Sequence, residues 1–402
     1  MSTRPLESSR MMAPAVTRTI QSRSLIIGIA FSVGAIIGGF SRPDEFFRGY
    51  LLAFMAWLGV TLGSMAILMI RHLTGGGWGT VIRRVMGAAM RCVPLMTVLF
   101  IPILFGLPRL YIWDRPLSTI ADAKLRAHLQ DITQSYLSVH GFIWRAVVYF
   151  AIWNVLSFLL TRWSREQDQL NPTLNAQKFK AVSGPGLVLY AFTISFAAID
   201  WLMSIDPSWI STIYGLIVLI GEVLSAMCFA VVVERILVNY KPMSEWLRPD
   251  FVQDHGKWML TFLMLWAYFS FSQLLIIWAG NLPDEITWYF RRFSGGWPAV
   301  GFALIFFHFV VPFVLLLSRS FKRDVRKLVW LAMWLMIMRL VDLFWIIEPN
   351  FSARLTVTWA DVVLPIAMGG IWLWLYFRNL NSMPLLSVND PDAFEVLEPV
   401  HE

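Results

Sequence analysis

Cysteine is almost absent from this sequence. The chain of 402 residues contains two cysteines, Cys92 and Cys228, which lie in apolar segments and belong to no CxxC or CxxCH pattern. Closely spaced cysteines are typical of disulfide frameworks, zinc sites, iron–sulfur clusters and attached c-type haem. The sequence therefore predicts that this chain carries none of these groups.

Histidine is also scarce, with six residues in the whole chain. A haem b in a membrane usually needs two histidines deep in facing helices, and only His308 lies deep in an apolar segment. The three glycines at 75–77 are not followed by the lysine and the serine or threonine of a phosphate-binding loop. We therefore predict that the chain binds no metal, haem or nucleotide of its own.

Charged residues make up only 15% of the chain, whereas 57% of its residues are hydrophobic. A helix that crosses the ~30 Å hydrocarbon core of a membrane needs roughly 20 mostly apolar residues. Ten such windows predict an all-α polytopic membrane protein with spans at 24–40, 49–70, 87–107, 143–161, 185–204, 211–234, 257–280, 297–318, 329–347 and 357–377. They form a membrane domain at 24–378, which lies between an N-terminal segment at 1–23 and a C-terminal tail at 379–402.

The first window and the loop charges predict the orientation of the chain. The window ends in GGFSRP at 38–43, which has no small-x-small cleavage pattern, so we expect a retained span rather than a signal peptide. Cytoplasmic loops keep lysine and arginine, and roughly two thirds of the 33 such residues lie on the side of the two chain ends. Both termini are therefore predicted to be cytoplasmic. The net charge of +7 reflects this bias and gives no reason to expect a nucleic-acid partner.

One long connection on the other side, at 109–142, has apolar residues at helical spacing between charged ones. This pattern predicts an amphipathic helix near 117–137 on the periplasmic surface. Such a helix would cover the mouth of the bundle or would provide a docking platform for an extrinsic subunit.

Several ionisable or polar side chains fall within the predicted spans. An ionisable residue there costs at least ~2.5 kcal/mol on insertion, so each should face the protein interior and have a partner or a task. Two interpretations remain open, a set of satisfied hydrogen bonds between helices and a proton path. Arg339 and Asp342, three residues apart on one helical face, also fit a neutralising pair. The proton-path candidates are Asp200, Glu222, Tyr268, His308, Arg339, Asp342 and Asp361.

Two of these candidates lie four residues before a proline. A proline removes the amide that would bond the carbonyl four residues earlier, which is that of His308 for Pro312 and that of Asp361 for Pro365. A free carbonyl beside a titratable side chain suits a water chain. A kink that serves only helix packing is the other interpretation.

Long segments of the chain resemble one family of membrane proteins. The segments are 183–190 (SGPGLVLY), 196–209 (FAAIDWLMSIDPSW), 211–215 (STIYG), 266–273 (WAYFSFSQ), 277–283 (IWAGNLP) and 308–313 (HFVVPF). They are similar to the ActF subunits of bacterial alternative complex III, which are NrfD-like integral membrane proteins. The likeness extends over about residues 24–378.

The resemblance implies a cofactor-free inner-membrane subunit of a respiratory quinol:electron-acceptor oxidoreductase. Such a subunit anchors redox subunits, is a candidate proton conduit and is not expected to be catalytic alone. The implied fold has two antiparallel four-helix bundles, from spans 2–5 and 6–9, with spans 1 and 10 at the periphery. The implied partners are a multihaem cytochrome c, an iron–sulfur protein, a paralogous NrfD-like subunit, small membrane subunits, lipid and a terminal oxidase.

In this family haem c and iron–sulfur clusters belong to the partner subunits, and the quinol site is usually placed in the paralogous subunit. If quinol binds this chain, its hydroxyl needs an acceptor near the outer surface. Asp200, His140 and Arg145 are then the candidates, with a local structural role as the alternative. A secondary transporter and a purely structural assembly scaffold remain the alternative functions.

Overall fold

The computed structural model describes residues 11–169 and 172–387, and this part of the chain is helical, with no β-strand. Ten helical segments in it are long and apolar enough to cross a membrane, which confirms the predicted all-α polytopic class. They are α1 (Ala15–Ser41), α2 (Pro43–Thr74), α3 with α4 (Gly77–Met90 and Val93–Phe105), α7 (Val139–Gln169), α8 (Pro172–Trp201), α9 (Tyr214–Leu237), α11 (Pro249–Gly280), α13 to α14 (Trp297–Leu317), α16 (Val325–Ile347) and α17 (Ala360–Leu380).

The helices are longer than several of the predicted windows. The third span begins at Gly77 rather than at 87, because its first turns carry Arg83 and Arg84, which a search for apolar windows rejects. Both arginines are buried, with side chains directed into the protein. An apolar window therefore marks the part of a helix that can face lipid, and misses a part that protein covers.

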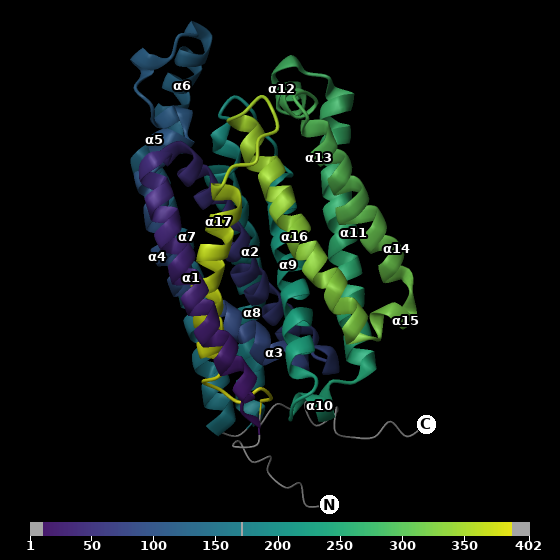
Figure 1. Ribbon diagram of the computed structural model, residues 1–402. Coiled ribbons are helices and arrows are strands. Elements are labelled where there is room, and N and C mark those ends of the chain that lie inside the picture. The colour runs from purple at the N-terminus through teal and green to yellow at the C-terminus, as the bar shows by residue number, and fades with distance from the viewer. Residues whose placement is uncertain (1–10, 170–171, 388–402) are drawn as a thin grey trace, which may run out of the picture.

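The spans are arranged as two antiparallel four-helix bundles (Figure 1). The first contains α2, α3 with α4, α7 and α8, and the second contains α9, α11, α13 to α14 and α16. The bundles meet mainly through α2 and α9, and α1 packs along α17 beside α2. This is the arrangement that the resemblance implied.

Small residues bring the backbones of the contacting helices close together. A Cβ atom at Gly63 on α2 would overlap the carbonyl oxygen of Glu222 on α9, and one at Gly370 on α17 would overlap the backbone of Gly28 on α1. Apolar side chains gain little by leaving lipid for a helix interface, so close packing at small residues has to hold such helices together.

The first and last described residues lie side by side. The amide of Leu385 donates to the carbonyl of Met11 at 2.8 Å. Figure 1 shows α10 (Met243–Trp246) at the same end of the molecule, with α6 (Ala123–Ser135) and α12 (Pro283–Arg292) at the other. We call these the α10 end and the α6 end. The cytoplasmic location of the termini stays a prediction.

Helix α6 occupies the middle of the predicted amphipathic stretch at 117–137. It begins only after Asp122, whose carboxylate accepts from the amides of Lys124 and Leu125 and so caps the first turn. Leu117 lies before it in a short 3-10 turn (Leu117–Thr119), and Leu129 is fully buried against the bundle. The helix is therefore shorter than predicted and packs through one apolar face.

Two spans are irregular. The third is interrupted between Met90 and Val93, where the turn bonds its own backbone through the amide of Cys92 and the carbonyl of Ala89. The eighth contains a π-helical segment, Leu304–Val310, whose register is visible in the bond from the Val311 amide to the Phe306 carbonyl. π-helical turns inside α-helices are frequent at functional sites.

Gly63→Ala tests the contact between the bundles. The added methyl group would meet the α9 backbone, so we expect a loss of stability of about 1 to 3 kcal/mol, measured as a lower unfolding temperature in detergent. Gly34→Ala on α1 is the matched control, because a Cβ there meets nothing within 4 Å. Equal unfolding temperatures for the two variants would contradict the close contact.

Candidate functional site

A chain of six buried side chains runs from the first bundle into the second. Its members lie on α8, α9, α16, α11 and the π-helical segment, and we call them the inter-bundle chain: Tyr190, Glu222, Arg339, Asp342, Trp266 and His308. Four of the predicted proton-path candidates, which are Glu222, His308, Arg339 and Asp342, are thus brought together by the fold. Sequence alone gave no reason to include Tyr190 or Trp266.

Glu222 is the link between the two bundles. The hydroxyl of Tyr190 donates to its Oε2 atom at 2.9 Å. Its Oε1 atom is buried and has no hydrogen-bond partner among the described residues. One carboxyl oxygen is therefore held in place, and the other has no hydrogen bond that protonation would break.

Glycines make room for this carboxyl and for the arginine beside it. A Cβ at Gly59 on α2 would lie 3.2 Å from Cγ of Glu222, and one at Gly221 would overlap the guanidinium of Arg339. Arg339 is close enough to Glu222 to act on it electrostatically. The glycine next to Glu222 in sequence therefore lets a positive charge approach the carboxyl.

Arg339 and Asp342 form the neutralising pair that their spacing predicts, through a hydrogen bond from the guanidinium to Oδ2 of Asp342. Trp266 on α11 donates to the same oxygen at 3.3 Å. Arg339 also donates to the carbonyl of Val218 on α9 at 3.4 Å. The pair thus ties together three helices of the second bundle.

His308 completes the inter-bundle chain. Its ring lies against the indole of Trp266, with 4.3 Å between the ring centroids. Both ring nitrogens are buried and lack a partner of standard hydrogen-bond geometry in the described part of the chain, although the backbone of Met338 is near. A buried imidazole with free nitrogens is suited to accept or pass on a proton.

Asp200 belongs to a separate, closed cluster at the α6 end. Arg145 donates to both of its carboxylate oxygens, at 2.9 to 3.1 Å, and Tyr149 donates to Oδ2 at 2.8 Å. The guanidinium of Arg145 also lies 3.9 Å from the ring centroid of Tyr136. Burial, and next the Asp200 carboxylate, raises the pKa of Tyr136 to about 12, so this phenol stays protonated. The cluster is saturated and resembles a structural ion pair.

The other predicted site residues lie outside both groups. His140 is exposed, and no hydrogen bond joins it to Asp200 among the described contacts. Tyr268 is 62% exposed on α11. Asp361 accepts from the amide and hydroxyl of Thr358, at 2.7 and 2.8 Å, at the start of α17. The fold therefore does not bring these three into the inter-bundle chain.

Sequence reasoning missed a buried acid–base pair at the α10 end. Glu234 on α9 and His255 on α11 are fully buried, with 2.8 Å between Oε1 and Nδ1. Nε2 of His255 also lies 2.8 Å from the carbonyl of Trp78. Glu234 is the last residue of the predicted window 211–234, and His255 lies just before the window 257–280. Neither residue was therefore considered as an intramembrane group. Extending each span by two helical turns would have found both.

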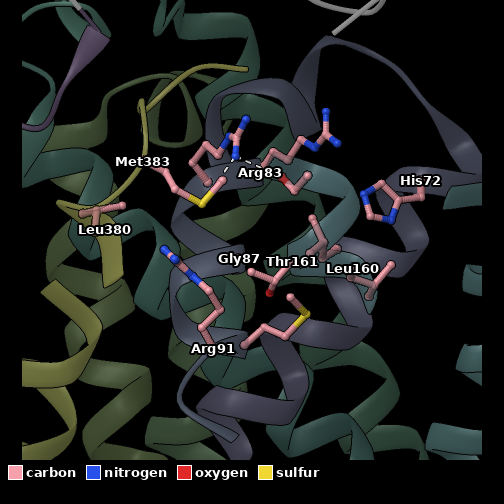
Figure 2. Close-up of a pocket in the computed structure, with 12 residues that line it drawn as sticks. His72, Arg83, Gly87, Arg91, Leu160, Thr161, Leu380 and Met383 are labelled. Atoms are coloured by element: carbon pink, nitrogen blue, oxygen red, sulfur yellow. Dashed lines mark hydrogen bonds between the residues drawn. The ribbon is translucent and has the colours of Figure 1, made fainter. Parts of the chain in front are cut away.

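The arginines at the α10 end surround only a very small cavity. Figure 2 shows His72, Arg83 and Arg91 around it, with Leu380 and Met383 on one side. Its volume is about 20 Å³, enough for one water molecule. Arg83 donates to Gln167 at 2.6 Å, and Arg84 forms an ion pair with Asp168. These arginines therefore hold helices together and leave no room for a phosphate.

A much larger cavity, of about 640 Å³, lies in the second bundle at the α6 end. Its walls come from α9, α11, α12, α13 and α16 and are mainly aromatic and aliphatic. Trp266 and Asp342 belong both to its lining and to the inter-bundle chain. This large cavity therefore adjoins the buried polar groups.

Within residues 11–169 and 172–387, no three histidine, cysteine, aspartate or glutamate side chains are grouped so that they could hold a metal ion. Cys92 and Cys228 are buried free thiols, and His401 lies outside the described residues. The expectation that this chain carries no cofactor stays a prediction.

No family model matches this chain, and no curated protein matches it either. The resemblance to ActF subunits therefore stays a prediction that rests on the quoted segments. The geometry of the site bears on proton conduction, whereas a respiratory role rests on those segments.

Arg145→Met tests whether the Asp200 cluster is structural. The substitution leaves a buried carboxylate without its cation, so we expect a loss of about 3 kcal/mol or more, measured by unfolding in detergent. Arg162→Met on the same helix is the control, because the exposed pair of Arg162 and Glu166 should contribute less than about 1 kcal/mol. A similar small effect for both variants would argue against the structural role.

Proposed function

We propose that this chain is the membrane subunit of a respiratory quinol:electron-acceptor oxidoreductase of the alternative complex III type. In this proposal it lies in the bacterial inner membrane with cytoplasmic termini, anchors the redox subunits and conducts protons. Haem c and iron–sulfur clusters belong to its partners: a multihaem cytochrome c, an iron–sulfur protein, a paralogous NrfD-like subunit and small membrane subunits.

One observation carries the proton-conducting part of the proposal. Glu222 has one carboxyl oxygen fixed by Tyr190 and one buried oxygen with no partner. Ionisable groups inside a membrane are expensive, and acids with histidines recur in the proton relays of pumps and transporters. Glu222 takes up a proton on Oε1 and releases it without moving the fixed oxygen, while Arg339 offsets the negative charge of the deprotonated state.

The contrast with Asp200 supports the choice of Glu222. Every oxygen of Asp200 is engaged by Arg145 or Tyr149, so a quinol hydroxyl would have to displace an ion pair before it could bond there. The local structural interpretation of Asp200 is therefore favoured, and this chain is not assigned the quinol oxidation step.

The surface of the α6 end supports an anchoring role. Helix α6 packs through Leu129 and leaves its polar face exposed, and α12 lies at the same end of the second bundle. If this end is periplasmic, both helices face the compartment in which extrinsic redox subunits would dock.

Nothing in the irregular spans favours the alternative of a secondary transporter. Transporters often bind substrate at broken helices whose free backbone groups point at the ligand. The break in the third span instead bonds within itself, through Ala89, Cys92 and Met96.

Purification of the chain from its native membrane in mild detergent tests the respiratory role. We expect a multihaem cytochrome and an iron–sulfur protein to copurify, with haem absorbance and quinol:acceptor activity, and mass spectrometry would identify them. A colourless preparation of this chain alone would contradict the proposal and favour a transporter.

Glu222→Gln tests the proton path within the assembled complex. The amide keeps the size of the side chain and a bond to Tyr190 but cannot exchange a proton, so we expect proton transfer to fall by roughly tenfold or more. Glu166→Gln on the exposed end of α7 is the matched control, with unchanged transfer expected.

Copurification of the partner subunits would be measured for both variants. Intact assembly with unchanged proton transfer in Glu222→Gln would remove Glu222 from the path and favour the purely structural scaffold.

A further inference from the structure

The large cavity of the second bundle has a polar end whose side chains all carry hydrogen-bond donors. Trp209 and Trp345 each direct an indole N–H into a buried position with no acceptor among the described residues. An indole nitrogen can donate but cannot accept. Both side chains line the cavity, so an acceptor inside it would satisfy them.

Arg292 adds a positive charge to the same end. It is almost completely buried and donates to the carbonyls of Trp288, Trp345 and Ile346, at 2.7 to 3.1 Å. A guanidinium has five N–H groups. After these three bonds, two N–H groups of Arg292 remain for a further acceptor. No carboxylate in the described part of the chain lies within ion-pair distance of Arg292, whereas its neighbour Arg291 pairs with Asp206 at 2.8 Å.

These donors form one compact cluster around Trp288. Its ring stacks on Trp209 with centroids 4.9 Å apart, and the ring of Trp345 lies 5.3 Å away. The guanidinium of Arg292 lies 3.4 Å from the Trp288 centroid. Burial lowers the pKa of Arg292 to about 9, so the cluster still carries its positive charge at neutral pH.

The rest of the cavity is apolar and reaches the surface of the bundle. Phe271 on α11 and Phe302 on α13 line it and are 63% and 71% exposed. In a membrane these side chains face lipid. The volume of about 640 Å³ lies within the range of small-molecule sites, roughly 300 to 1,000 Å³.

We propose that this cavity binds an acidic lipid, with its carboxylate or phosphate at Arg292, Trp209 and Trp345 and its hydrocarbon chain between α11 and α13. A buried cation without a carboxylate partner favours an anionic ligand over a neutral one. Acceptor oxygens satisfy the two indoles, and the apolar walls take the tail. The cavity shares Trp266 and Asp342 with the inter-bundle chain, but this proposal does not depend on proton conduction by that chain.

The test is retention of defined lipids by the purified full-length chain, measured by native mass spectrometry after delipidation in detergent. Oleate and phosphatidylglycerol are the acidic probes and separate a free carboxylate from a phosphate head group. Phosphatidylcholine and a neutral isoprenoid quinone are the comparison ligands. We expect one acidic lipid per chain to be retained at concentrations at which neither comparison ligand is.

Two substitutions remove single donors and keep an aromatic ring. Trp209→Phe and Trp345→Phe should each weaken retention of the acidic lipid by roughly tenfold, because each removes one hydrogen bond to a charged oxygen. Trp330→Phe is the matched control, since Trp330 lies on α16 with Trp345 but is 72% exposed and does not line the cavity.

A second pair of variants changes the volume of the cavity rather than its hydrogen-bond donors. A Cβ at Gly301 would lie 3.7 Å from the indole nitrogen of Trp345, an ordinary contact, so Gly301→Ala should retain the lipid and Gly301→Phe should lose it. Unfolding temperatures identify variants that fail to fold. Equal retention of neutral and acidic ligands, preference for the quinone, or unchanged retention in both Trp209→Phe and Trp345→Phe would overturn the proposal.

Discussion

The close approach of α2 and α9 is the contact on which the rest of the molecule depends. Gly59 and Gly63 let the α9 backbone come so near that Glu222 lies between the two bundles, within reach of Tyr190. In a membrane, helices do not associate to escape water, so backbone proximity and internal hydrogen bonds have to hold them together. A side chain at either glycine would separate the bundles and remove the link from the first bundle to the buried groups of the second.

Two carboxylates of this protein illustrate how burial can have opposite outcomes. Asp200 is surrounded by donors and a cation, which stabilise its charge and leave nothing to exchange. Glu222 has one donor, a neighbouring arginine and a free oxygen. The difference does not lie in burial, which is nearly complete for both. It lies in the number of bonds that a change of protonation would break, and this number separates a structural pair from a group that can act.

Sequence could predict the ten spans because lipid imposes a length and a composition on every helix that crosses it. It could also predict the pairing of Arg339 with Asp342, since that contact lies within one helix. It could not predict that Tyr190 meets Glu222, because the contact joins two helices and depends on glycines of a third. Glu234 and His255 were not predicted as a buried pair for another reason. Protein rather than lipid covers these parts of the two helices, so polar residues are tolerated there and the apolar windows end. The donors around Trp288 come from three separate elements, and no spacing in the sequence connects them.

The electrostatics of the large cavity determine which way an acidic lipid would lie in it. Both Arg292 and Asp342 line the cavity, but Asp342 is neutralised by Arg339 and further bonded by Trp266. That side therefore has little net charge and can lie beside hydrocarbon. The side at α12 keeps the charge of Arg292, on which Asp206 acts only from beyond ion-pair distance among the described residues. A head group near Asp342 would find no unpaired cation there, because Arg339 is already bonded to Asp342. The head group consequently belongs at the α6 end. The tail then lies along Trp266 and Asp342, where it would limit the access of lipid-side water to the inter-bundle chain.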